Sequence, residues 1–156
     1  MTAVPEPSHD ALRRVVIAVS GGPSDERIVR TACELARPTK AQLVAVHIVE
    51  VDWSLPLDAD VAARSEEAQR VLDMVEGVAE ADRMPIETVL LQARDVGAAI
   101  VDEASADDAD LLILGLPYKK RFGGDFAIGR TVPYVLKNAP CAVMVIRDPM
   151  AEESTP

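Results

Sequence analysis

Two glycine-containing segments follow apolar, strand-like runs and hold the residues best suited to chemistry. Ser20-Gly21-Gly22-Pro23 comes after the β-branched run Arg14–Val19. A longer segment starts at the end of Leu111–Gly115 and closes with Gly129-Arg130-Thr131. Glycines let backbone N–H groups approach a ligand closely, and a helix N-terminus presents unpaired N–H groups with partial positive charge. The two segments therefore predict an anion site, and a phosphate group fits it.

The charge of the second segment supports this prediction. Residues 115–131 contain one acidic residue and four basic ones, so their local charge is +3 in a chain with a net charge of −10. The four basic residues are Lys119, Lys120, Arg121 and Arg130. The hydroxyls of Ser20 and Thr131 add hydrogen-bonding groups. Simpler interpretations stay open, because glycines after strands make tight turns and 119–121 can form a solvated loop tip.

Other chemistries find little support in the sequence. It lacks the GxxxxGK[ST] and GxGxxG patterns, and Ala18 occupies the first glycine position of a GxSxG turn around Ser20. No cysteine and histidine cluster has the spacing of a zinc site, and Asp107, Asp108 and Asp110 lack that of a calcium loop. We therefore expect no catalytic residues, no metal-binding residues and a protein that is not an enzyme.

The elements that must position these segments alternate between strand and helix. Apolar runs predict five strands, at Arg14–Val19, Gln42–Val49, Ile86–Gln92, Leu111–Gly115 and Cys141–Arg147. Helical periodicity predicts four helices, at 24–37, about 60–82, Val96–Ala104 and about 131–138, and we expect Ser24 and Asp95 to cap the first and the third. This alternation predicts an α/β fold with a doubly wound parallel sheet and helices on both faces. Ligands of such sheets bind beyond the carboxyl ends of the strands, so the first and fourth strands would open onto one crevice.

Length and composition bound the remaining possibilities. A chain of 156 residues favours one domain, at 13–148, with a flexible leader at 1–12 and a flexible tail at 149–156. The 26 acidic residues outnumber the 16 basic ones, which argues against nucleic acid and anionic membrane surfaces as partners. Two distant cysteines indicate a reduced, intracellular protein. The apolar runs are too short for membrane insertion, so we expect a cytoplasmic protein.

On these residues the chain resembles the universal stress protein family over about 13–148. The most specific stretch is Gly129–Ile146, GRTVPYVLKNAPCAVMVI, and DADLLILG at 108–115 matches the strand before the nucleotide loop. The resemblance implies a five-stranded parallel sheet of order 3-2-1-4-5 and a homodimer formed through the last strand, 141–147. It also implies a stress-response protein, and many members of the family bind ATP or AMP.

The sequence departs from the nucleotide-binding members of that family at several positions. Those members carry an Asp after the first strand and a loop of the form Gly-x2-Gly-x9-Gly-Ser/Thr, whereas Ser20 stands in place of the Asp. Gly115 matches the first glycine, Tyr118 replaces the second, and the spacer to the third has ten residues. Arg130 stands where the phosphate-binding hydroxyl is expected, and Thr131 follows one position late. Arg130 can still meet phosphate by charge, and Tyr118 can stack on a base.

A second resemblance keeps another ligand open. SGGPSDER at 20–27 and LVAVH at 43–47 are similar to the universal-stress-like domain of potassium-sensor histidine kinases, and the chain is similar to such domains of transporters. Some of those domains recognise cyclic di-AMP through a serine-rich turn and a tyrosine in the second strand. Here Gly22 stands at the place of a second serine and His47 at that of the tyrosine. The resemblance implies a possible transporter or kinase partner.

The sequence thus favours a non-catalytic regulatory protein that binds ATP or AMP between the first and fourth strands. In this hypothesis Ser20, Gly21 and Gly22 approach the adenosine, while the second segment holds the phosphates under a mobile basic lid formed by 119–121. The complete set of candidate ligand-binding residues is Ser20, Gly21, Gly22, His47, Gly115, Tyr118, Lys119, Gly129, Arg130 and Thr131. The alternatives are a module that binds cyclic di-AMP and a protein-interaction module whose degenerate pocket binds no nucleotide.

Overall fold

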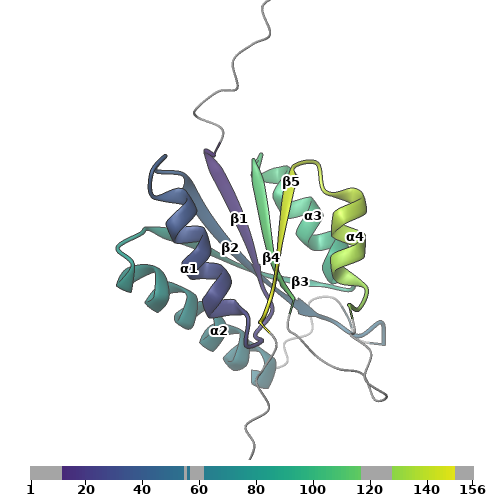
Figure 1. Cartoon of the computed structure of the whole chain (residues 1–156). Coiled ribbons are helices and arrows are strands. Elements are labelled where there is room, and N and C mark those ends of the chain that lie inside the picture. The colour runs from purple at the N-terminus through teal and green to yellow at the C-terminus, as the bar shows by residue number, and fades with distance from the viewer. Residues whose placement is uncertain (1–11, 55, 57–61, 117–127, 150–156) are drawn as a thin grey trace, which may run out of the picture.

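The computed structural model describes residues 12–54, 56, 62–116 and 128–149 and has a single parallel sheet between two layers of helices (Figure 1). The strands are β1 (Arg14–Val19), β2 (Gln42–Glu50), β3 (Ile86–Ala93), β4 (Leu111–Leu116) and β5 (Ala142–Arg147). The helices are α1 (Asp25–Ala36), α2 (Ala62–Ala81), α3 (Val96–Ala106) and α4 (Thr131–Asn138). The strand order is β3-β2-β1-β4-β5 and every pairing is parallel, which confirms the expected fold and its 3-2-1-4-5 order.

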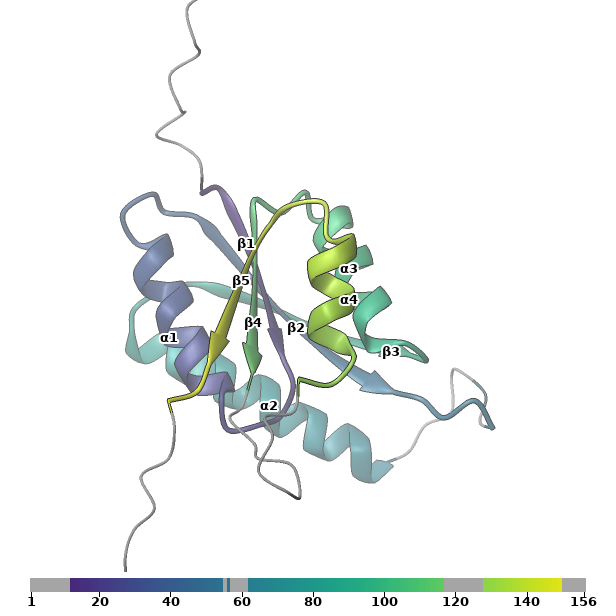
Figure 2. The same cartoon turned by 45° about the vertical axis from the view of Figure 1, so that its right-hand side comes forward.

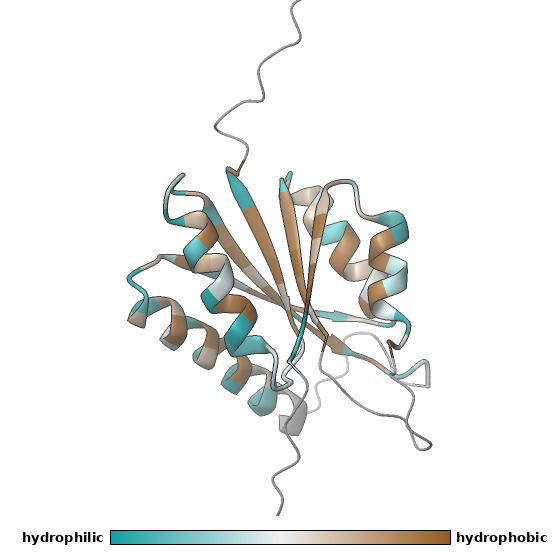
Figure 3. Cartoon of the chain, in the orientation of Figure 1, coloured by the Kyte–Doolittle hydropathy of each residue, from teal (hydrophilic) through white to brown (hydrophobic). Residues whose placement is uncertain are grey.

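The sheet buries both of its faces, each under one pair of helices. Along β1, Val15, Ile17 and Val19 pack with α1 and α2, whereas Val16 and Ala18 pack with α3 and α4. Figures 1 and 2 show the two helix pairs on opposite sides of the strands. Figure 3 shows the apolar strands between helices whose outer surfaces are more polar. Because successive side chains of a strand point to opposite faces, the odd-numbered residues of β1 lie on the α1/α2 face and the even-numbered ones on the α3/α4 face.

The helix starts follow the sequence signals with one exception. Asp95 caps α3, as expected, because its Oδ1 accepts a hydrogen bond from the N–H of Ala98 at 3.1 Å. Ser24 occupies the N-cap position of α1, but its side chain makes no bond to the helix. Its hydroxyl instead donates to Oδ2 of Asp148 at 2.9 Å, which ties the start of α1 to the residue after β5. The capping function predicted for the Ser24 hydroxyl is therefore replaced by a long-range contact.

The described residues include the last position of the expected leader and the first position of the expected tail. The leader expected at 1–12 includes Leu12, yet this side chain packs against the core on the α1/α2 face. The remainder of that leader, and the tail from 150, lie outside the described residues. Among the described helices, none is long and apolar enough to cross a membrane.

Candidate functional site

The turn between β1 and α1 is closed by the carboxylate of Asp25. This residue is 2% exposed, and its oxygens accept hydrogen bonds from the backbone N–H groups of Ser20, at 3.0 Å, and Gly21, at 2.7 Å. The hydroxyl of Ser20 accepts another from the N–H of Gly22 at 3.2 Å. Successive backbone N–H groups of this kind make an anion-binding concavity, and here the chain supplies the anion itself. The amides that the sequence analysis assigned to a ligand are therefore already paired.

Gly21 permits this closed turn and faces away from the predicted crevice. Its φ is +86°, in the left-handed region that costs residues with a side chain about 1–2 kcal/mol. A Cβ added to Gly21 would lie 3.4 Å from Cγ2 of Val71 in α2 and 4.0 Å from Cε1 of His47. Gly21 thus contributes to the α1/α2 side of the sheet.

Burial and hydrogen bonding oppose one another at Asp25. Burial raises the pKa of this carboxyl above its ordinary value, and it is the largest effect. The N–H groups of Ser20 and Gly21 and the charge of His47 act in the other direction but do not cancel it. The buried carboxyl therefore holds a proton more readily than an exposed aspartate does.

His47 lies on the α1/α2 face and is separated from the opposite face by the sheet. It pairs in register with Val19, and its ring Nδ1 lies 2.9 Å from the carbonyl oxygen of that residue. The residue is 8% exposed. Together with Ser20 and Glu67 it lines a cavity of about 390 Å³ beside α2. The structure therefore brings His47 together with Ser20, but not with the start of α4.

A second, more apolar cavity, called here the crevice, lies on the α3/α4 face at the carboxyl ends of β1 and β4. Its volume is about 350 Å³. Its walls come from three central strands, from α3 and from the first turn of α4: Ala18, Val19, Ser20, Val46, Ile48, Glu50, Val96, Ile100, Leu114, Gly115, Leu116, Ile128, Thr131 and Val132. Of the residues predicted from the sequence, Ser20, Gly115 and Thr131 lie here. This is the place where strand order reverses and where open α/β sheets bind their ligands.

Gly115 has a packing role in addition to its place in the crevice. A Cβ at this position would lie 2.9 Å from Cβ of Ser24 and 3.3 Å from Cγ2 of Ile28. The absence of a side chain lets β4 pass close beneath the first turn of α1. Its match to the nucleotide loop therefore coincides with a steric requirement of the fold.

The start of α4 is open, in contrast to the start of α1. Gly129 has a φ of +77°, and Arg130 occupies the N-cap position without a side-chain bond to the helix. Arg130 is exposed and makes no hydrogen bond or ion pair through its side chain with the part of the chain that is described. Pro133 has no N–H, so the first turn offers the amides of Thr131 and Val132 to a ligand.

A further cavity, called here the Arg94 pocket, adjoins the crevice and was not foreseen from the sequence. It has a volume of about 460 Å³ and is lined by Glu50, Trp53, Arg94, Asp95, Val96, Gly97, Arg130, Thr131 and Tyr134. The guanidinium carbon of Arg94 lies 5.0 Å from the centre of the Trp53 ring, and Nη1 of Arg94 donates to the carbonyl oxygen of Asp52 at 3.0 Å. The one available signal was Trp53, the single tryptophan, placed in a loop.

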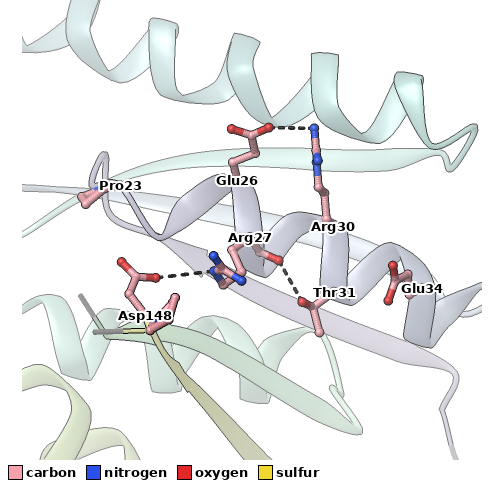
Figure 4. A pocket seen from close by; sticks show the side chains of 8 residues that line it. Pro23, Glu26, Arg27, Arg30, Thr31, Glu34 and Asp148 are labelled. Atoms are coloured by element: carbon pink, nitrogen blue, oxygen red, sulfur yellow. Dashed lines mark hydrogen bonds and ion pairs between the residues drawn. The ribbon is translucent and has the colours of Figure 1, made fainter. Parts of the chain in front are cut away.

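Tyr118, Lys119 and the basic lid of the second segment lie outside the described residues. A groove of about 630 Å³ runs along α1 (Figure 4) and is lined by Pro23, Glu26, Arg27, Arg30, Thr31, Glu34, Asp148 and Pro149. Glu26 pairs with Arg30 at 2.8 Å, and Arg27 lies 3.9 Å from Asp148. These charges partner one another, so the groove is a weaker candidate than the crevice.

Comparison with known proteins gives one consistent result. Residues 11–147 match the family model described as the universal stress protein family. The sensor protein KdpD of Mycobacterium tuberculosis (strain CDC 1551 / Oshkosh) is 27% identical over 146 residues, which cover 94% of this chain but only 16% of KdpD. Universal stress protein MJ0531 of Methanocaldococcus jannaschii is 27% identical over 146 residues, covering 90% of this chain and 85% of that protein. The structure of a universal stress protein from Archaeoglobus fulgidus superposes with a TM-score of 0.71 at 23% identity, covering 86% of this chain and 98% of that one.

Proposed function

Because this chain belongs to the universal stress protein family, we propose that it is a non-catalytic regulatory protein that binds an adenine nucleotide in the crevice. The observation that carries the proposal is the crevice itself, an apolar cavity of about 350 Å³ at the switch point between β1 and β4. Small-molecule sites in proteins are typically apolar cavities of about 300–1,000 Å³ with a few polar groups that fix orientation. We further propose that the protein acts in the cytoplasm.

The walls of the crevice suit an adenosine group. Ala18, Val46 and Leu114 provide a flat apolar surface from adjacent strands, which suits a planar base. Ser20 contributes its hydroxyl at the rim. Ser20 lines the crevice, whereas Gly21 and Gly22 do not, so Ser20 is the member of that turn that we assign to the ligand.

The start of α4 suits the phosphate. The hydroxyl of Thr131 and the first-turn amides of Thr131 and Val132 face a site where a helix N-terminus favours negative charge. The guanidinium of Arg130 adds a full positive charge beside them. Charge-assisted hydrogen bonds of this kind are about twice as strong as neutral ones.

Solved relatives give independent support. Universal stress proteins have been solved in complex with cAMP and, for the Archaeoglobus fulgidus protein, with dAMP. A family member from Arabidopsis thaliana has been solved with AMP bound. These complexes favour an adenine nucleotide as the ligand class, with ATP, AMP and cyclic di-AMP as the candidates to compare.

Binding is tested by thermal unfolding and titration calorimetry with AMP, ATP and cyclic di-AMP, each in excess. A ligand that binds the native state raises the unfolding midpoint. Arg130→Ala is expected to weaken AMP and ATP binding by about 1–3 kcal/mol. Lys137→Ala, which removes an equal charge near the other end of α4, is the matched control and should leave affinity unchanged.

Three outcomes are informative. No midpoint shift with any ligand would overturn nucleotide binding and favour an interaction module. Binding of cyclic di-AMP alone would transfer the assignment to that ligand. If the Arg130→Ala and Lys137→Ala proteins bind AMP and ATP with equal affinity, Arg130 is not part of the phosphate site.

We also propose that β5 pairs with a second copy of the chain. This strand lies at one end of the sheet, and its side chains from Val143 to Ile146 are only half-buried. An edge strand of apolar character presents unpaired N–H and C=O groups to another strand. Sedimentation at micromolar concentration should show a dimer, and a monomer would contradict the proposal. The similarity to KdpD supports a sensor kinase as a further partner, and a transporter is the alternative that the sequence analysis gave.

A further inference from the structure

The Arg94 pocket adjoins the crevice at the start of α4. Glu50, Val96 and Thr131 line both cavities. A phosphate bound at Thr131 would therefore lie at the junction between them. Further phosphates that extend from it toward α3 would enter the Arg94 pocket, whose volume is about 460 Å³.

Two arginines from different parts of the chain line this second cavity. Arg94 follows β3, and Arg130 precedes α4. The Arg94 guanidinium is held in place, because it donates to the carbonyl oxygen of Asp52 and lies over the Trp53 ring. An arginine that is already positioned loses less conformational entropy when it binds an anion, so it is a better anion ligand than a free side chain.

Two carboxylates line the same cavity and must be weighed against the arginines. Asp95 accepts the N–H of Ala98 at the N-terminus of α3, where the helix dipole offsets part of its charge. Glu50 also lines the cavity, and its negative charge opposes an anion. The start of α4 also borders the cavity, and its partial positive charge favours an anion there.

We propose that the Arg94 pocket is a second anion subsite that receives the outer phosphates of a nucleotide whose first phosphate lies at Thr131. Arg94 is then a specificity-determining residue that makes the chain prefer a nucleoside triphosphate over the monophosphate. This inference rests on the proposed binding of an adenine nucleotide in the crevice. It goes further because it proposes that the protein distinguishes nucleotides by the number of their phosphates.

The test compares ATP with AMP in the wild-type chain and in Arg94→Gln. The wild type should bind ATP more tightly than AMP. The variant should lose about tenfold or more in ATP affinity and less than about twofold in AMP affinity, because only the outer phosphates reach Arg94. Arg37→Gln is the matched control, since Arg37 also donates to a backbone carbonyl, that of Asp82 at 3.0 Å, at the far end of α1.

The fluorescence of Trp53 supplies a second readout. Trp53 is the single tryptophan of the sequence and lines the Arg94 pocket, so tryptophan emission reports on this pocket alone. ATP bound at Arg94 should change this emission in the wild type, and AMP should leave it unchanged. The change should disappear in Arg94→Gln and persist in Arg37→Gln.

The possible failures are distinguishable. If neither AMP nor ATP binds, the proposed function itself fails. If both nucleotides bind and Arg94→Gln changes the ATP and AMP affinities by the same factor, the subsite is wrong while nucleotide binding in the crevice stands. If the Arg94→Gln protein does not fold, Glu50→Gln is the second test. Removal of the Glu50 carboxylate should increase the affinity for ATP more than the affinity for AMP. An ATP affinity that is unchanged or weaker than that of the wild type would overturn the subsite.

Discussion

The β1–α1 turn and the start of α4 are two solutions to the same local problem. Each is a glycine-containing turn at the carboxyl edge of the sheet, and each precedes a helix whose first N–H groups lack partners within the helix. In the first turn the carboxylate of Asp25 accepts the N–H groups of Ser20 and Gly21. In the second, the Arg130 side chain makes no capping bond, and among the described residues no acceptor pairs with the first N–H groups of α4.

This difference teaches that glycines and a helix start do not by themselves make a ligand site. What matters is whether the chain already supplies an acceptor. Asp25 can be seen in the sequence, where it suits the helix dipole, but its burial and its backward contact to Ser20 come from the folded turn. The closed turn stabilises the fold, and we propose that the open one binds a ligand.

The strongest way to break the comparison is to remove the internal acceptor. Asp25→Ala should lower the free energy of unfolding by about 2–3 kcal/mol at neutral pH, because two charge-assisted hydrogen bonds are lost. Asp95→Ala removes an exposed cap from α3 and should cost only about 1 kcal/mol. Urea denaturation measures both. Equal effects of the two substitutions would show that the first turn depends no more on its carboxylate than an ordinary helix cap.

A second prediction concerns the packing that supports the closed turn. Gly115→Ala should destabilise the protein by about 1–2 kcal/mol, because the new Cβ would lie 2.9 Å from Cβ of Ser24. Gly77→Ala is the control of opposite sign, since a Cβ there meets nothing within 4 Å in the middle of α2. That change should stabilise the protein by about 0.5–1 kcal/mol. Stabilisation by Gly115→Ala would refute the close approach of β4 to α1.

The smallest expected effect is the pH dependence of the closed turn. The pKa of Asp25 is raised in the folded state, so the folded chain binds the proton more tightly than the unfolded chain. The proton-linked part of the contribution of Asp25 to stability is therefore complete below the ordinary aspartate pKa and is lost as pH rises through the raised value. Urea denaturation of the wild type and Asp25→Asn between about pH 3 and 8 isolates this term. The stability of the wild type relative to the variant should fall with rising pH, and a rise would contradict the raised pKa.

Much of the fold was predictable from residues alone. The continuous apolar runs of β1 and β4 predicted strands buried on both faces, and the alternation of strands with helices predicted the parallel sheet. Asp95 predicted the start of α3. These signals are local, because periodicity and capping depend on neighbours along the chain. The family resemblance added the strand order.

The placement of the candidate site needed tertiary structure. His47 and Thr131 were expected in one site, yet the register of β2 places His47 on the α1/α2 face and the crevice is on the other. A strand residue is assigned to a face only when pairing and crossovers are known, since a shift of one residue reverses it. The Arg94 pocket likewise joins segments that are distant in the sequence.

The sequence by itself thus determined which segments form strands and helices, because those preferences act between near neighbours. Only the tertiary structure decided which turn pairs its backbone N–H groups with its own carboxylate and which arginines share a cavity. The physical reason is that burial, charge pairing and close approach depend on atoms brought together from different parts of the chain. Asp25, closed over its own turn, and Arg94, placed beside the start of α4, show the two outcomes.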